Sequence, residues 1–275
     1  MTRIRSALAA ALTATLLGCC ATVHAATPVQ VQAPRHLPAV AWADADWGRV
    51  ARPAVDYKND GSAGAQAFAA LVPDIEAYVH EIARGVVQRL YKSPAEVPAF
   101  KTLELRIREW NGEKGSAEPR DGIAWKDGAP PERIIVNVNT RWLQSYAAKG
   151  GHMADEVKGI LFHEMVHAYQ HSEGMAAAAL ESLADLVRYQ AGFGYAKDRR
   201  LGGKYSDPYK TGAFFFAYLV EQKGFKDFGP CFNATARPGE NFPWSWENAI
   251  AACTEGGDVN ALWAEYQAWI PTQSP

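Results

Sequence analysis

Apolar residues recur at helical spacing over two long stretches of the chain. Across residues 66–91 they fall three or four positions apart, which predicts one long amphipathic helix with Pro73 in a first turn or at a kink. Residues 155–172 predict a second strong helix, and Gly174 stands after it as the expected C-cap. These are the two helices that the pattern predicts in the first two thirds of the chain.

A strict alternation of apolar and charged residues covers 103–110. This period of two predicts a strand with one face toward the core and one face in water. Residues 123–125 and 133–138 predict two further short strands. Helices are expected over 176–191, 211–223 and 244–269. A small mixed sheet followed by a helical region indicates the α+β class.

The first 25 residues have the pattern of an export signal. Arg3 and Arg5 precede an apolar run over 7–17, which is too short to span a membrane. Two processing sites compete: a cut before Ala26, or a lipobox over 16–19 that would make Cys19 a lipidated N-terminus. Either site predicts an exported protein, secreted or periplasmic, with a lipid anchor as its one route to a membrane.

Residues 26–54 are expected to form an extended, proline-containing leader, with Trp42 and Trp47 as the residues expected to dock on the domain. The folded domain is expected over 55–270. Two of the four cysteines lie in the signal, and in an oxidising compartment the remaining pair, Cys231 and Cys253, favours a disulfide over two zinc-binding thiolates.

The charge balance narrows the class of partner. The chain has a formal net charge of −2 and no block of like charges. No basic excess is present to neutralise phosphates, which argues against nucleic acid as the main partner. No sequence feature specifies an oligomeric state.

The candidate chemistry lies in the helix predicted over 155–172. His163 and His167 are four residues apart, so both imidazoles leave one face of the helix and can share a tetrahedral zinc ion. Glu164 points to the side of both, where it can take a proton from a zinc-bound water without being a ligand. This pattern predicts hydrolysis of peptide bonds.

A catalytic zinc ion usually takes a third protein ligand. His171 continues the series, but about 12 Å of helix rise would separate it from His163, and a solvated His171 is the better interpretation. Glu173 is not expected to be a ligand either, because Gln170 stands where a glycine would be needed to turn the chain back toward the metal. Glu181, on the next helix, is the preferred ligand, with His171 and Asp185 as the fallbacks. Asp185, one turn after Glu181, is expected to orient one histidine, most plausibly His163.

Hydrolysis also needs a hydrogen-bond donor for the developing oxyanion. Tyr209, at the start of the helix predicted over 211–223, is the first choice. Tyr169 and Tyr205 are the alternatives.

These segments together resemble the basic secretory protein family of plant and bacterial zinc peptidases. The main resemblance lies in residues 159–170, which contain His163, Glu164 and His167, and in residues 180–188, which begin Leu180-Glu181-Ser182-Leu183-Ala184-Asp185. Further matching segments are residues 134–138, 209–219 and 260–266. Ser182 stands where the family usually has glycine, and this acidic chain does not fit the word "basic".

The resemblance implies a zincin fold in which His163, His167 and Glu181 bind zinc and Glu164 is catalytic. It also implies that an extended peptide pairs with a strand near residues 122–126 by edge addition. Two other functions stay open at this point: a non-catalytic zinc-containing binding or defence protein, and an envelope lipoprotein on the same fold.

Overall fold

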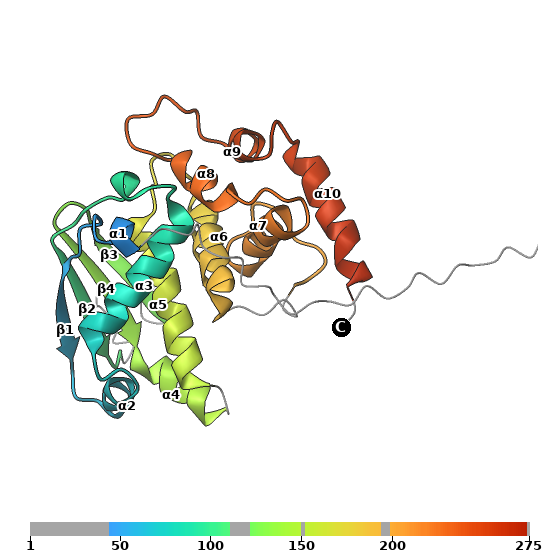
Figure 1. Cartoon of the computed structure of the whole chain (residues 1–275). Helices are drawn as coiled ribbons and strands as arrows, with labels where there is room; N and C mark the ends of the chain where they lie inside the picture. Colours follow the sequence, from blue (N-terminus) through green and yellow to red (C-terminus); the bar gives the residue numbers. More distant parts are fainter. Residues whose placement is uncertain (1–43, 111–121, 150–151, 194–198, 274–275) are drawn as a thin grey trace, which may run out of the picture.

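The computed structural model describes residues 44–110, 122–149, 152–193 and 199–273 (Figure 1). The export signal, Cys19 and Trp42 lie outside these ranges. Within the described ranges, every helix is too short or too polar to cross a membrane. Trp47 and Val50, from the segment expected to be a leader, are buried in the core, and Trp47 ends the short helix α1 (Asp44–Trp47).

The sheet has four strands in the order β1-β2-β4-β3. The strands are β1 (Ala54–Asn59), β2 (Thr102–Arg108), β3 (Ala124–Ala129) and β4 (Arg133–Asn139). β1, β2 and β4 are parallel, whereas β3 runs antiparallel to β4 and forms one edge. The predicted mixed sheet is confirmed, although β3 is longer than expected. β1 was not predicted, because its six residues carry no apolar run and owe their conformation to pairing with β2.

The alternation along β2 has the predicted period, but its second face is not simply solvated. Leu103, Leu105 and Ile107 are buried on the core face. Glu104, on the opposite face, is only 4% exposed, because Arg106 and Arg133 form ion pairs with its carboxylate at 2.5 and 2.8 Å. A buried carboxylate of this kind needs such partners.

The single helix predicted over 66–91 is wrong. The segment forms two helices, α2 (Ala63–Leu71) and α3 (Ile75–Leu90). Pro73 lies between them, and Val72 before it leaves the helical conformation (φ −129°, ψ 77°), as the residue preceding a proline tends to do. Asp74 then caps α3 by accepting a hydrogen bond from the backbone N–H of Ala77.

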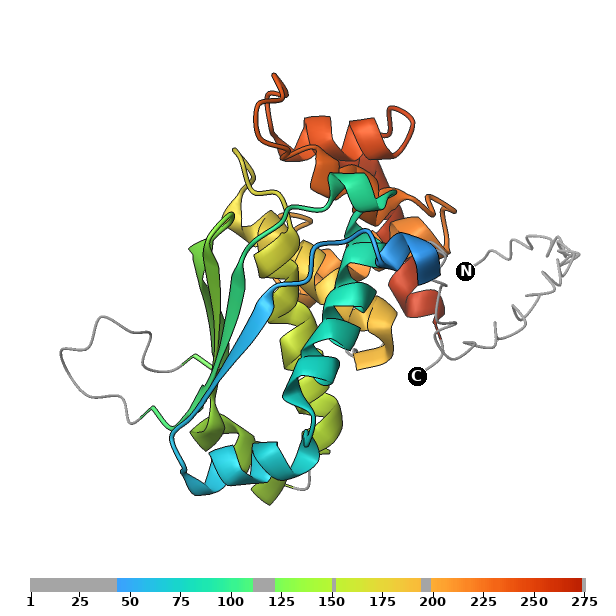
Figure 2. The same ribbon diagram turned by 60° about the vertical axis from the view of Figure 1, so that its left-hand side comes forward.

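Helix α5 (Met153–Tyr169) is the centre of the molecule. It and α3 cover one face of the sheet (Figure 2). Buried residues occur on nearly every side of α5, as expected for a helix enclosed by neighbours. The helix ends at Tyr169 because Gln170 is extended (ψ 149°), so Gly174 lies in the following turn (φ 70°) and is not the predicted C-cap. Helix α4 (Thr140–Ala148), which was not predicted, connects β4 to this region.

The C-terminal region is helical, as predicted. Helix α6 (Ala177–Arg188) packs against both α5 and α7 (Lys210–Glu221). The one helix predicted over 244–269 is instead two, α9 (Trp246–Cys253) and α10 (Val259–Trp269), separated by a turn in which Gly256 has φ 87°. Helix α8 (Phe228–Ala234) was not predicted, and the predicted disulfide between Cys231 and Cys253 joins it to α9.

Candidate metal centre

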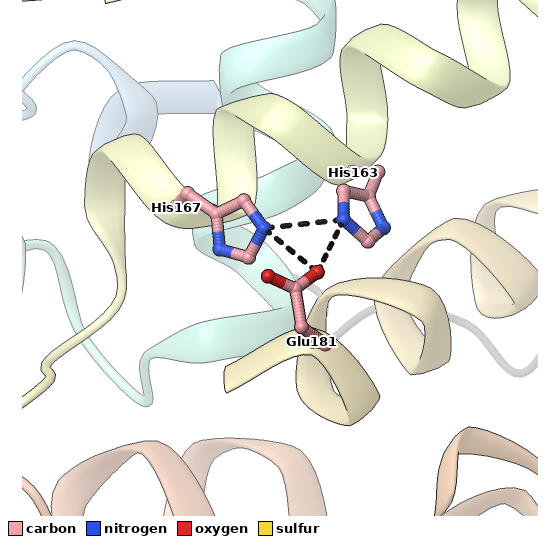
Figure 3. A group of neighbouring side chains, drawn as sticks. All are labelled: His163, His167 and Glu181. Carbon is pink, nitrogen blue, oxygen red and sulfur yellow. Dashed lines mark hydrogen bonds and ion pairs between the residues drawn. The ribbon is translucent and has the colours of Figure 1, made fainter. Parts of the chain in front are cut away.

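Two histidines of α5 and one glutamate of α6 converge on a single point (Figure 3). His163 Nε2 lies 3.0 Å from Glu181 Oε2 and 3.1 Å from His167 Nε2, and His167 Nε2 lies 3.4 Å from Glu181 Oε2. His163 is 8% exposed, and the other two residues are partly buried. The triangle closes because α5 and α6 pack side by side in opposite directions.

The dimensions of this triangle fit a metal ion. Tetrahedral ligands at about 2.05 Å from zinc lie about 3.3 Å from one another, and the three edges of the triangle measure 3.0, 3.1 and 3.4 Å. Two imidazoles and one carboxylate are a donor set of catalytic zinc sites, which keep the fourth position open. The group of His163, His167 and Glu181 could therefore hold a divalent metal ion.

Asp185 forms a hydrogen bond with Nδ1 of His163, the ring nitrogen that faces away from the centre. Its Oδ1 atom lies 2.7 Å from His163 Nδ1, so the ring N–H at Nδ1 donates to the carboxylate and Nε2 faces the centre. Burial acts to lower the pKa of His163, but the hydrogen bonds to Asp185 and Glu181 outweigh it and raise that pKa to about 10. Burial acts to raise the pKa of Glu181, yet the hydrogen bonds from His163 and His167 lower it to about 2.

Gln170 lies in the corresponding place beside His167 and was not predicted. Its side-chain amide lies 2.8 Å from His167 Nδ1, while the amide oxygen Oε1 is buried without a partner among the described residues. Turning the amide by half a rotation lets Oε1 accept the Nδ1–H of His167, which leaves His167 Nε2 for the metal. The sequence indicates this contact through the position of Gln170, three residues after His167 and therefore on the same side of the helix.

Glu164 lies beside the centre and is not one of its converging ligands. It is 6% exposed, and its Oε2 atom is buried without a hydrogen-bond partner among the described residues. Burial raises the pKa of Glu164, although His163 and His167 act to lower it. A buried carboxylate oxygen with a raised pKa and no partner is suited to accept and return a proton.

Tyr209 faces the same centre from the start of α7. Its ring stacks on His163, with the centroids 6.0 Å apart and the planes at 22°. Its backbone has φ 57° and ψ −136°, a strained conformation for a residue other than glycine. Burial, together with the carboxylates of Glu181, Asp185 and Glu164, raises the pKa of Tyr209, so the hydroxyl stays protonated at neutral pH and can donate a hydrogen bond.

The two alternative tyrosines lie elsewhere. Tyr169 is buried against Phe100, and its backbone carbonyl accepts a hydrogen bond from Tyr91. The Tyr205 hydroxyl donates to Glu247 Oε1 at 3.1 Å. Among the described residues, the cavity around the metal centre is lined by Tyr209 and by neither of these two.

His171 is half-buried and held by neighbours, and is not the freely solvated residue that was expected. Because α5 ends at Tyr169, the chain turns away before His171. The backbone N–H of His171 donates to Asn233 Oδ1 at 2.8 Å, its ring packs edge-on against Tyr91, and its Nε2 atom is buried. Neither His171 nor the exposed Glu173 belongs to the converging group.

The centre lies in a cavity of about 930 Å³. The walls come from the edge strand β3, from α5 and α6, and from the start of α7. Residues 122–126, the segment expected to hold an extended peptide, line this cavity. A cavity of this size next to an open strand edge has room for several residues of a peptide.

Comparison with known proteins gives one finding. The model of a family described as "BSP: Peptidase of plants and bacteria" matches residues 52–266. No curated protein and no solved structure matches the chain. The matched range contains every residue of the converging group and of the cavity wall.

Proposed function

The chain belongs to the BSP family, the peptidases of plants and bacteria, and on this premise we propose that it is a zinc-dependent peptidase. The observation that carries the proposal is the convergence of His163 Nε2, His167 Nε2 and Glu181 Oε2 beside the unpartnered carboxylate oxygen of Glu164. A purely structural zinc site usually has four protein ligands and needs no such carboxylate. This favours an enzyme over a binding protein that keeps zinc for structure.

The proposed mechanism assigns one task to each side chain. A bound zinc ion would supply a Lewis acid that polarises the peptide carbonyl and acidifies water. Glu164 accepts the proton of the attacking water and then donates it to the leaving amine, and its raised pKa suits both transfers. The Tyr209 hydroxyl donates a hydrogen bond to the carbonyl oxygen as negative charge develops there. Asp185 and Gln170 orient the two imidazoles.

Strand β3 is the proposed docking edge for the substrate. It pairs with β4 on one side and, among the described residues, with no strand on the other. An extended peptide that adds to the free edge would run along the cavity past Glu164. Strand β3, helix α5 and the helices that follow α5 together line the cavity, and this arrangement supports a zincin-like fold. A crystal structure superposed on known zincins tests that assignment.

The function is tested by metal content and by peptide cleavage in one experiment. Wild type and Glu164→Gln are each expected to hold one zinc ion per chain, because Glu164 is not a ligand. Wild type should cleave a mixed peptide library, whereas Glu164→Gln should not. Glu173→Gln, which changes an exposed glutamate outside the cavity, is the matched control and should cleave like wild type. Cleavage retained in Glu164→Gln would refute the mechanism, and a purified protein that takes up no divalent metal would refute the function.

Export is part of the proposal. It is supported by the charged and apolar pattern of the first 25 residues and by the disulfide between Cys231 and Cys253. Mass spectrometry of the mature N-terminus separates the two processing sites: cleavage before Ala26 indicates free secretion, and a diacylated Cys19 indicates a lipid anchor. An N-terminus at Met1 would contradict export.

A further inference from the structure

The charges on the cavity wall divide into two groups. Among the described lining residues, the carboxylates are those of Glu164, Glu181 and Asp185, and the proposed metal chemistry uses all three. The cations are Lys126 on β3, Arg188 at the end of α6 and Lys210 at the start of α7. Once the metal centre is accounted for, the rest of this described wall therefore presents positive charge, although the whole chain has a formal net charge of −2.

Arg188 is the most firmly held of these cations. Its Nη2 atom donates to Glu156 Oε1 at 3.0 Å, and its Nε atom donates to the Phe193 carbonyl at 3.2 Å. The guanidinium lies against Gly159, where a Cβ atom would stand 2.9 Å from Arg188 Nε. Any side chain larger than glycine at position 159 would have to displace it.

The contacts that hold Arg188 leave part of it for a ligand. Among the described residues, they use two of the five guanidinium N–H groups. The side chain remains 23% exposed and lines the cavity. A planar guanidinium fixed in one orientation is suited to bind a carboxylate.

Arg188 also lies in line with the metal centre. Residues seven apart on a helix share one face, so Arg188 follows Glu181 on the same side of α6, about 10 Å further along the axis, with Asp185 between them. The opposing residues of α5 form matching pairs: His167 meets Glu181, His163 meets Asp185, and Glu156 meets Arg188. An extended peptide advances about 3.3 Å per residue, so a group that reaches Arg188 belongs to a residue within about three positions of the bond at the metal.

We propose that Arg188 binds a carboxylate of the substrate, and that the cavity thereby selects peptides with an anionic group within about three residues of the scissile bond. This inference rests on the proposed peptidase function and names its substrate class. The carboxylate is an aspartate or glutamate side chain, or the free C-terminus of a short peptide. Lys126, which is half-buried on β3 and lines the same cavity, adds to the attraction.

The test uses matched peptides and the zinc-loaded full chain. One series places Glu or Gln at each of the three positions on either side of a fixed cleavage site, with blocked ends. A second series compares a free C-terminus with an amidated one. Wild type is expected to prefer the carboxylate roughly 10- to 100-fold in kcat/KM at one position or at the terminus, the range for a charge-assisted hydrogen bond. The series that shows the preference identifies the source of the carboxylate.

Variants separate recognition from a structural ion pair. Arg188→Gln should bring the Glu-to-Gln ratio, or the acid-to-amide ratio, close to one. Glu156→Gln breaks the same ion pair but leaves the guanidinium, so it should keep the preference. Arg188→Lys keeps the charge without the planar fork, so it should give an intermediate ratio. It replaces Arg188→Gln as the test variant if Arg188→Gln does not fold.

The failures of the two proposals are distinguishable. Equal cleavage of both peptide types by wild type would overturn the role of Arg188 while the peptidase function stands. Equal loss of the preference in Arg188→Gln and Glu156→Gln would also overturn it, because the ion pair would then act only through the packing of α5 on α6. A wild type that binds zinc but cleaves no peptide would overturn both proposals.

Discussion

His163 Nδ1 and Asp185 Oδ1 lie 2.7 Å apart across the interface between α5 and α6. The bond joins the helix that carries His163 and His167 to the helix that supplies Glu181, so one contact both orients an imidazole and ties the two helices together. In the proposed function Asp185 is a positioning residue, because it would act on the metal through His163.

Asp185→Asn should weaken zinc binding about 10- to 100-fold, because a neutral amide polarises the ring less than a carboxylate does. Competition with a chromophoric chelator measures the affinity. Asp227→Asn, which changes an exposed aspartate paired with Lys92, is the control and should not alter it. An unchanged affinity in Asp185→Asn would show that packing alone orients His163.

Zinc binding should release about one proton per ion at pH 7. The pKa of His163 is raised to about 10 by Asp185 and Glu181, above the value of about 6.5 for an unfolded chain. The protonated ring therefore stabilises the fold fully below pH 6.5, and this contribution is lost as the pH rises through about 10. Zinc needs the neutral ring, so its affinity should rise about tenfold per pH unit between pH 7 and 9. Calorimetry in buffers of different ionisation enthalpy counts the proton, and a buffer-independent heat would contradict the prediction.

Tyr209→Phe should lower kcat roughly 100-fold with little change in KM, because the hydroxyl donates only as charge develops on the carbonyl oxygen. The zinc content should stay at one per chain. Tyr205→Phe is the matched control, since its hydroxyl bonds to Glu247 away from the cavity. A loss confined to KM would place Tyr209 in substrate binding instead.

Gly212→Ala should lower the free energy of unfolding by about 1–3 kcal/mol, measured by urea denaturation. A Cβ atom at position 212 would stand 2.2 Å from Ser182 Oγ and 2.8 Å from the Asp207 carbonyl. Removing the hydroxymethyl group in Ser182→Gly/Gly212→Ala should restore part of the loss, because the Asp207 contact remains. Strictly additive effects of the two substitutions would show that Ser182 does not limit the approach of α7 to α6.

Much of the local structure could be predicted because it depends on neighbours in the chain. The period of two along β2 and the helical spacing of His163 and His167 each follow from backbone geometry within a few residues. The division into α2 and α3 at Pro73 also has a local cause, because the residue before a proline tends to leave the helical conformation. The prediction of one helix was wrong because the apolar pattern continues across Pro73. The burial of Glu104 was not local, because it depends on Arg133 from a neighbouring strand.

The sequence by itself determined that two imidazoles and a carboxylate would leave one helix side by side, because helical periodicity sets their directions wherever the helix lies. Only the tertiary structure decided what they meet. The packing of α6 against α5 in the opposite direction brings Glu181, Asp185 and Arg188 to their partners. The end of α5 at Tyr169 turns His171 away, and β3 closes the cavity. The physical reason is that these contacts join segments distant in the chain, and their geometry is set by how helices and strands pack, which no spacing along one segment encodes.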